Sequence, residues 1–300
     1  MAFFARKETP AQNIAFCALA AAFDAILSLV GALLPLSSVF LMAAAPLIAS
    51  FVAYFCQKRY HALYLFSALG ISIAVSAWDF QNTLFYLLPC LCSGLVYGYG
   101  VRTKAPASFS LFLSSLCQFL FFILSLYLVK AIYQVNMVDV LLAFFGKERN
   151  PASEAAIVLL GLAYSFGASG IAHFVFILVS PKLGIPLVWK ARRLWAHPCF
   201  CLASSLLCFA FLFLYPPLAY FFLGISLYWV SLSLVEFAPK AHWGFYALSF
   251  LLLFASILLF AFLYSSLSPV QGFGMIALFP AALSLSCFLE VLLGKKKSTH

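Results

Sequence analysis

Charged residues are scarce in this sequence. Of its 300 residues only 8% are Asp, Glu, Lys or Arg and only eight are acidic, whereas 66% are hydrophobic. Soluble globular domains carry about 25% charged residues. The composition therefore excludes a soluble globular protein and predicts an integral membrane protein.

The motifs of nucleotide binding and hydrolysis are missing as well. The sequence contains no Walker A motif, no H-E-x-x-H, no G-x-S-x-G and no paired Cys/His spacing typical of a metal site. Its nine cysteines lie within or at the ends of apolar runs and none forms a C-x-x-C pair, which favours reduced thiols buried as small hydrophobic groups. We therefore expect neither an enzyme nor a cofactor, and any transport would draw its energy from an ion gradient or another subunit.

Apolar runs fill most of the chain. A bilayer core requires about 20 apolar residues per helix. Pro, Gly and charged clusters separate ten such runs, at 13–34, 39–56, 62–78, 83–101, 108–129, 154–180, 198–215, 217–236, 244–264 and 271–293. The run 62–78 is short, and one kinked helix across Pro216-Pro217 would remove a span. We predict an all-α fold, a polytopic transmembrane helical bundle of about ten spans (eight to ten), whose first span is not cleaved as a signal peptide.

The basic residues alternate with these spans. If the N-terminus is cytoplasmic, only Lys130, Lys147 and Arg149 of the 17 Lys and Arg residues fall in outer segments. The positive-inside rule then places both termini in the cytoplasm, and we expect a multi-pass protein of the bacterial cytoplasmic (inner) membrane. Because topology explains the net charge of +9, the lipid bilayer is the expected partner and nucleic acid is not.

Two connections between the spans are longer than a turn. Residues 132–146 place Asn136, Asp139 and Ala143 on one helical face, which indicates an amphipathic helix. That helix is either a passive anchor at the outer interface or a lid over an external site. The inner connection, 181–198, mixes aromatic and basic side chains, namely Trp189, Trp195, Lys190, Arg192 and Arg193. It binds lipid headgroups or forms a docking surface for a cytoplasmic partner.

One acidic residue lies in the middle of a predicted span. Asp24 comes about 16 Å from the inner end of the first helix, at about 1.5 Å per residue, and a charge at that depth costs roughly 2.5–3.5 kcal/mol. A helical projection places it on a polar face with Asn13, Cys17, Ala20, Ser28 and Gly31. An adjacent face, made of Ala18, Ala21, Ala22 and Ala25, would let another helix approach closely.

Other polar residues at depth are few. Gln118 is central in the fifth span, and His173 lies in the sixth within the stretch YSFGASGIAHF. We hypothesise that Asp24, Gln118 and His173 face one internal polar cavity, although His173 is equally explained as a neutral residue bonded to a backbone carbonyl. Asp79 and Asn82, in AWDFQN after the third span, line an outward-facing site or form a solvated turn.

Three stretches of the chain resemble the YybS-like uncharacterised bacterial membrane proteins. They are AFCALAAAFDAILSLVGALLPL near the N-terminus, LPCLCSGLVYGYGVRTKA at 88–105 and SPKLGIPLVWKARRLWAHP at 180–198. That family is in turn similar to the substrate-binding S components of energy-coupling-factor (ECF) vitamin transporters. In S components a helical bundle holds a small molecule near the outer side, and an alanine motif on the first helix contacts a transmembrane coupling subunit driven by cytoplasmic ATPases.

The resemblance implies a domain organisation and a contact surface. Residues 1–198 would form a six-helix S-component-like membrane domain, and residues 199–300 a C-terminal membrane domain of four helices. The contact with a coupling subunit would lie at Ala18, Ala22 and Ala25.

These observations favour a bacterial inner-membrane transport-type protein. It would be a substrate-binding, S-component-like subunit for a small molecule, without its own ATPase, and its binding residues would be Asp24, Gln118, His173, Asp79 and Asn82. A second hypothesis is a non-transport membrane scaffold or regulator of envelope assembly, in which Lys190, Arg192 and Arg193 recruit a partner. A third is a proton-coupled secondary transporter, in which Asp24 carries the proton.

Overall fold

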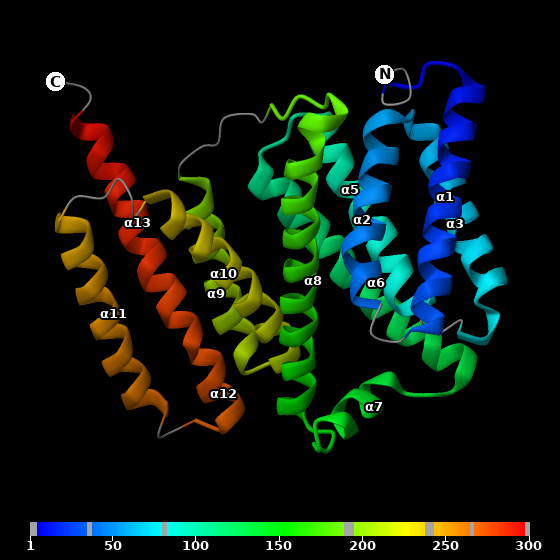
Figure 1. Cartoon of the computed structure of the whole chain (residues 1–300). Helices are drawn as coiled ribbons and strands as arrows, with labels where there is room; N and C mark the ends of the chain where they lie inside the picture. Colours follow the sequence, from blue (N-terminus) through cyan, green and yellow to red (C-terminus); the bar gives the residue numbers. More distant parts are fainter. Residues whose placement is uncertain are drawn as a thin grey trace. The chain divides into compact units, whose positions relative to one another are not determined.

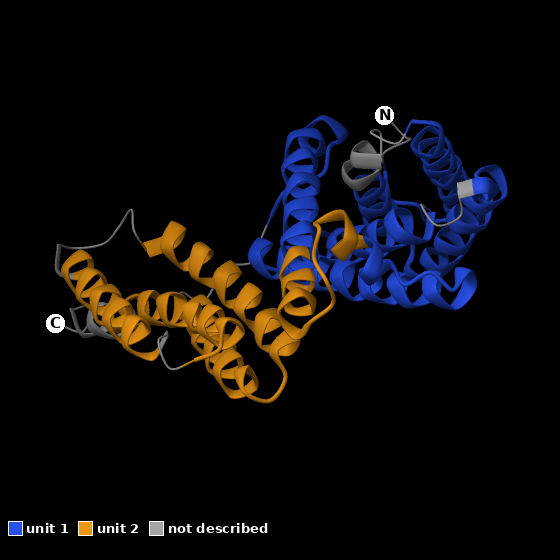
Figure 2. Cartoon of the chain, turned by 90° about the horizontal axis from the view of Figure 1, so that it is seen from below, with its two compact units in different colours: residues 1–140, 161–191 blue, residues 141–160, 192–300 orange. Residues whose placement is uncertain are grey.

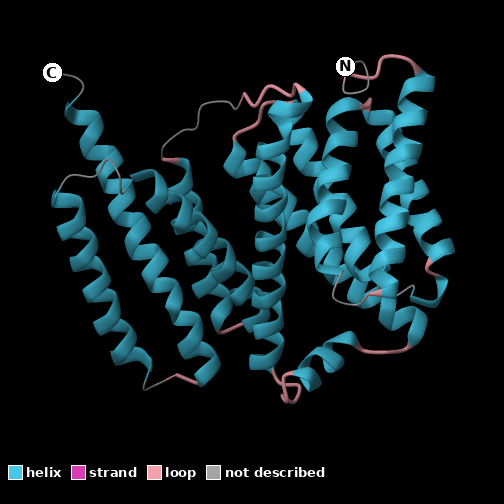
Figure 3. Cartoon of the chain, in the orientation of Figure 1, coloured by secondary structure: helices cyan, strands magenta, loops and turns pink. Residues whose placement is uncertain are grey.

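A computed structural model describes residues 5–34, 38–79, 83–188, 195–237, 243–264 and 267–297 of the chain, and within these ranges the side chains of 38–43, 79, 243–244, 264 and 291–297 are not described. The regular elements in these ranges are all helical (Figures 1 and 3). The α-helices are α1 (Pro10–Leu33), α2 (Ser38–Phe55), α3 (His61–Val75), α5 (Leu88–Arg102), α6 (Ala107–Tyr133), α7 (Met137–Phe144), α8 (Pro151–Val179), α9 (Ala196–Leu212), α10 (Pro216–Phe237), α11 (Trp243–Tyr264), α12 (Pro269–Gly274) and α13 (Leu278–Lys297). Shorter turns are η3 (Lys58–Tyr60), η4 (Ala77–Asp79), the π-helical η5 (Thr83–Leu87), η6 (Ser180–Leu183) and η8 (Met275–Ala277).

Local chemistry sets the helix ends. At the start of α1, the Thr9 hydroxyl accepts a hydrogen bond from the backbone N–H of Gln12, and the Gln12 side chain accepts one from the backbone N–H of Thr9. This reciprocal capping box satisfies two otherwise unpaired N–H groups, and Pro10 has no N–H to lose at that position. Ser268 and Gln271 repeat the arrangement at the start of α12.

Seven helical segments in the described part of the chain are long and apolar enough to cross a bilayer. They are Pro10–Leu33, Thr83–Arg102, Ala107–Tyr133, Pro151–Leu183, Pro216–Phe237, Phe245–Leu263 and Pro269–Glu290. These segments indicate a multi-pass membrane protein. Among the described residues, Ala44–Phe55 and Ala196–Leu212 are apolar stretches of fewer than 18 residues, although α2 as a whole runs over 18 residues, Ser38–Phe55.

All ten segments expected from the sequence fall on helices, and within the described residues seven helical segments meet both the length and the apolarity of a span. The shortest expectation, 62–78, corresponds to α3, which ends at Val75. The alternative of one kinked helix across Pro216-Pro217 is wrong, because α9 ends at Leu212 and α10 begins at Pro216. The expected amphipathic helix is present as α7.

The chain divides into two compact units (Figure 2). Unit 1 comprises residues 1–140 and 161–191, and unit 2 comprises residues 141–160 and 192–300. The boundary expected at residue 198 and the observed change between 191 and 192 lie in the same connection. Residues 141–160, expected in the first domain, belong to unit 2, so α8 contributes its first part to unit 2 and its remainder to unit 1.

The close approach of α2 and α5 organises unit 1. A Cβ added to Gly94 or Gly98 would meet the backbone of Pro46 or Ser50 in α2. The Ser50 hydroxyl donates to the carbonyl oxygen of Gly94 at 3.0 Å and to that of Pro46 at 2.6 Å. Glycines four residues apart thus let the two backbones touch, as in small-xxx-small helix pairs.

Around this pair, α1 packs on α2 and α3, and α5 also contacts α6. The unit 1 part of α8 adds Gly161 against the rings of Phe119 and Phe122 in α6. Six long helices therefore build unit 1: α1, α2, α3, α5, α6 and the second part of α8.

In unit 2, α9, α10 and α13 pack together around Cys208, Leu212 and Leu223. Ala155, in the first part of α8, belongs to the same core and is fully buried. In contrast, α11 packs mainly on α13 and exposes large side chains, including Phe250, Phe254 and Phe262. An exposed apolar surface of this kind is typical of a helix that faces lipid.

Candidate functional site

The polar face expected on α1 is turned into the protein. Asn13, Cys17, Ala20, Asp24, Ser28 and Gly31 are all buried. Asn13 holds the start of the helix, since its amide donates to the carbonyl of Thr9 at 2.8 Å and its Oδ1 accepts from the backbone N–H of Gln57 at the same distance. Asp24 lies farther along the helix, where its side chain is completely inaccessible to solvent.

The partner of Asp24 is Tyr64 of α3. The Tyr64 hydroxyl donates to Asp24 Oδ2 at 2.6 Å, and both residues are fully buried. The second carboxylate oxygen, Oδ1, has no hydrogen-bond partner among the described residues. A buried carboxylate with one unsatisfied oxygen is expensive to maintain, so this atom marks a place where a further donor or a proton would be favourable.

Three hydroxyl groups meet one helical turn beyond Asp24. Ser28 of α1, Ser76 after α3 and Thr83 of η5 are buried, with oxygen–oxygen distances of 3.4 Å (Ser28–Ser76), 3.2 Å (Ser28–Thr83) and 3.1 Å (Ser76–Thr83). Thr83 begins a π-helical turn, and such turns occur frequently at functional sites. The polar face of α1 therefore continues as a cluster of hydroxyl groups between three elements.

Gln118 lies in the same interior. It is fully buried, its Oε1 accepts from the Ser169 hydroxyl at 3.2 Å, and its amide donates weakly to the Cys90 thiol at 3.8 Å. The Tyr164 hydroxyl lies beside Gln118 and Cys90. Cys90 is also close enough to Asp24 to interact with it electrostatically.

Cys90 thus links the two polar groups that sequence reasoning singled out. It belongs to the same hydrophobic core as Tyr64, Cys17 and Ala20, and its thiol accepts from the Gln118 amide. We define the central cluster as Asp24, Tyr64, Cys90, Gln118 and Tyr164. One of its oxygen atoms, Asp24 Oδ1, is buried without a hydrogen-bond partner among the described residues, which is unusual for a packed core.

His173 lies elsewhere in unit 1. Its Nδ1 forms a short hydrogen bond with the Tyr97 hydroxyl, and the two rings meet edge to face at 5.5 Å. His173 is only half-buried. The structure therefore gives His173 a side-chain partner, Tyr97, while a bond from His173 to a backbone carbonyl stays a prediction.

The remaining expected site residues lie at the edge of the described ranges or outside them. Asp79 ends η4, and its side chain is not described. Asn82, Lys190, Arg192 and Arg193 lie outside the described residues. Within the described ranges, no group of three or more His, Cys, Asp or Glu side chains could hold a metal ion.

The alanine residues of α1 divide into two sets. Ala21 and Ala25 are buried in the core, whereas Ala18 and Ala22 are exposed. Ala11 and Ala15 are exposed as well and, at 100° per residue, continue the same line along the helix. Of the three residues expected at a partner contact, Ala25 is thus turned inward, and we define the alanine stripe as Ala11, Ala15, Ala18 and Ala22.

Sequence reasoning missed one polar pair in unit 2. His197 Nδ1 of α9 lies 3.0 Å from Glu236 Oε2 of α10, and the His197 ring stacks on Trp229 at 5.4 Å. His197 is fully buried. A histidine at the start of one apolar run and an acid at the end of the next could have signalled this pair, because adjacent antiparallel helices bring such ends together.

Comparison with known proteins adds no relative: neither a protein family model, nor a curated protein, nor a solved structure matches this chain.

Proposed function

We propose that this chain is a substrate-binding subunit of a membrane transport system, without an ATPase of its own, and that its substrate is a small molecule bound at the central cluster. The observation that carries the proposal is Asp24, a buried carboxylate with one hydrogen bond from Tyr64 and one oxygen without a partner. Ionisable residues inside transmembrane segments are rare and mark substrate or ion pathways.

The chemistry of the cluster suggests what the substrate carries. Asp24 Oδ1 would accept a hydrogen bond, and the Tyr164 hydroxyl and the Gln118 amide would donate or accept one. A small molecule with an amine, amide or hydroxyl group would satisfy these atoms. Such a ligand would remove the energetic penalty of the buried carboxylate, which gives the site a source of affinity.

The alanine stripe supports the second part of the proposal, a separate coupling subunit. Small exposed side chains on a membrane helix allow another helix to approach closely. The stripe lies on α1, and we propose that a coupling subunit contacts it there, as the resemblance to S components would imply. The proposal therefore includes a transmembrane coupling subunit and cytoplasmic ATPases, in a bacterial inner membrane with both termini cytoplasmic.

Two pairs of matched variants test this function. Mass spectrometry of small molecules retained by the purified protein should show one ligand, and Asp24→Asn should lower its retention about tenfold, the loss expected for one charge-assisted hydrogen bond. Asp139→Asn, an exposed acid in α7, is the control. Ala22→Leu should prevent co-purification of partner subunits, whereas Ala163→Leu, at an exposed position of α8, should not. Repeated purification without a ligand or a partner would refute the proposal.

A proton-coupled secondary transporter is the second candidate, because the unpaired oxygen of Asp24 also suits a proton. Uptake would then need no partner subunit and would collapse when an ionophore removes the proton gradient. In that case Asp24→Asn would abolish the dependence of uptake on pH.

A further inference from the structure

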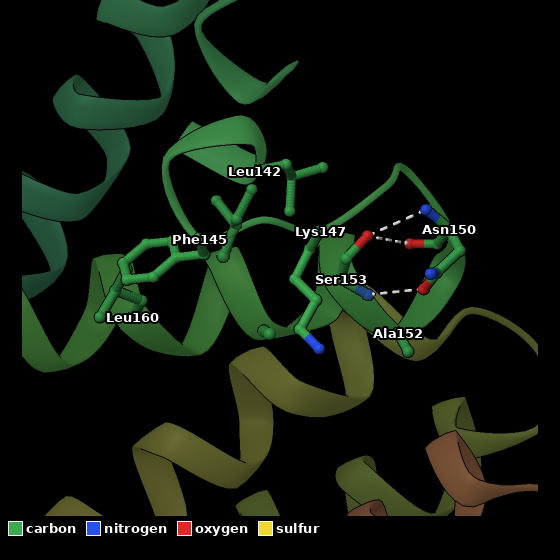
Figure 4. Close-up of a pocket in the computed structure, with 9 residues that line it drawn as sticks. Leu142, Phe145, Lys147, Asn150, Ala152, Ser153 and Leu160 are labelled. Atoms are coloured by element: carbon green, nitrogen blue, oxygen red, sulfur yellow. Dashed lines mark hydrogen bonds between the residues drawn. The ribbon is translucent and has the colours of Figure 1, made fainter. Parts of the chain in front are cut away.

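Unit 2 contains a pocket that shares no residue with the central cluster. It has a volume of about 520 Å³, within the range of roughly 300–1,000 Å³ typical of ligand sites. Nine residues line it (Figure 4): Leu142, Phe145, Lys147, Asn150, Ala152, Ser153, Ala156, Ile157 and Leu160. They come from the end of α7, the connection that follows it and the first three turns of α8.

Most of the pocket surface is apolar. Leu142, Ile157 and Leu160 are aliphatic, Phe145 is aromatic, and the two alanines add no polar atoms. This lining suits a hydrocarbon chain. It does not suit a polar metabolite, which would lose its hydration without gaining hydrogen bonds.

The two neutral polar residues of the lining are engaged with each other. The Ser153 hydroxyl accepts from the backbone N–H of Asn150 at 2.9 Å, and Asn150 Oδ1 accepts from the backbone N–H of Ser153 at 2.9 Å, as Figure 4 shows. These bonds cap the start of α8. Their side chains therefore stabilise the wall of the pocket and leave recognition of a charge to another residue.

Lys147 is the only charged residue among the nine. The nearby acid Glu154 is paired with Arg149 at 2.7 Å, and neither residue lines the pocket. An ammonium group beside an apolar pocket matches a ligand with a hydrocarbon chain and an anionic head.

The position of the pocket fits the boundary of a bilayer. Pro151–Leu183 is one of the seven apolar segments, so residues 146–150 mark the level at which the chain leaves the membrane. Phe144 at the end of α7 is 83% exposed, as expected for a side chain in contact with lipid. At this level the molecules that present both hydrocarbon and phosphate are membrane phospholipids.

We propose that this pocket binds one anionic phospholipid, with an acyl chain against Phe145, Ile157 and Leu160 and the phosphate beside Lys147. The bound lipid would fix the end of α7 to the start of α8. This site is independent of the substrate site proposed above.

Native mass spectrometry of the delipidated full-length protein tests the proposal. Palmitoyl-oleoyl phosphatidylglycerol and palmitoyl-oleoyl phosphatidylcholine share their acyl chains and differ in headgroup charge. The wild-type protein should retain one phosphatidylglycerol in preference to phosphatidylcholine, and Lys147→Gln should reduce that preference about fivefold, the effect of one basic residue at a membrane surface. Lys130→Gln, which removes another basic side chain at the end of a long helix, should leave the preference unchanged.

A second pair of variants tests the apolar part of the pocket. Ala156 lines the pocket and is exposed, so Ala156→Phe should fill the volume and lower the retention of both lipids at least fivefold, whereas Ala163→Phe, at an exposed position outside the pocket, should not. Equal retention of the two lipids by the wild-type protein, or equal effects of Lys147→Gln and Lys130→Gln, would overturn the proposal. If Ala156→Phe does not fold, the lysine pair decides alone.

Discussion

Tyr64 supplies the one hydrogen bond that the Asp24 side chain makes with the described residues. The donor is a phenol that is itself buried. Each side chain therefore pairs a polar atom of the other that would otherwise be unpaired in an apolar interior. Neither residue is replaceable alone without leaving an unpaired polar atom. We therefore regard Tyr64 as a positioning residue that holds Asp24 Oδ2 and leaves Oδ1 to the proposed substrate.

Removal of the Tyr64 hydroxyl should destabilise the protein. Tyr64→Phe leaves Asp24 without a donor, and we expect the free energy of unfolding in detergent to fall by about 2 kcal/mol. In an Asp24→Asn background the same change should have a smaller effect, because the acceptor is then neutral, and this double-mutant cycle isolates the pair. Tyr127, which is 68% exposed, provides the control. An equal effect of Tyr127→Phe and Tyr64→Phe would show that the bond contributes nothing.

Among the helices, α2 and α5 approach so closely that their contact has no room for a side chain at Gly94 or Gly98. Both Gly94 and Gly98 face the α2 backbone, which presents Pro46 and the small residues Ala49 and Ser50. Membrane helices gain little from hydrophobic burial against each other, since lipid is equally apolar. Close van der Waals packing and the Ser50 hydrogen bonds therefore stabilise the contact between α2 and α5.

Gly98→Ala should disrupt the helix pair. Even one methyl group would overlap the backbone of Ser50, and overpacking of this kind costs about 1–3 kcal/mol. A lowered unfolding temperature in detergent would report it. At Gly167, where a Cβ meets nothing within 4 Å, the same substitution should be neutral or slightly stabilising because alanine favours helix. The contact would be looser than described if both variants unfolded at the wild-type temperature.

Sequence periodicity predicted the helices and their polar faces better than it predicted which residues contact each other between helices. The polar face of α1 could be read from the spacing of Asn13, Asp24 and Ser28, because polar residues avoid lipid. The pairing of Asp24 with Tyr64 could not be read from the spacing, because it depends on which helices become neighbours. The same limit applies to the alanines: lipid and protein interior are both apolar, so composition does not distinguish exposed Ala18 from buried Ala21.

For the whole molecule, the distribution of basic residues specifies an orientation. The connection between α7 and α8 carries Lys147 and Arg149 but also Glu148, whereas the C-terminal residues 295–297 are all lysine. By the positive-inside rule we expect the lysine-rich end in the cytoplasm.

Reporter fusions should reveal this orientation. Alkaline phosphatase, which folds only outside the cytoplasm, should be active when inserted after Glu148 and inactive when fused at the C-terminus. Green fluorescent protein should give the opposite result. Active phosphatase at the C-terminus would reverse the orientation and place the phospholipid pocket on the cytoplasmic side.

Because α8 serves both units, the order of synthesis sets an order of assembly. All residues of unit 1 have been made once the ribosome reaches residue 191, whereas residues 141–160 must wait for α9, α10 and α13 to complete the core around Ala155. During that interval one helix is anchored at its C-terminal part and lacks its partners at its N-terminal part. A nascent chain stalled after α8 has left the ribosome, but before α10 and α13 have followed, should therefore expose the start of α8 to the insertion machinery, and its release should depend on the arrival of these helices.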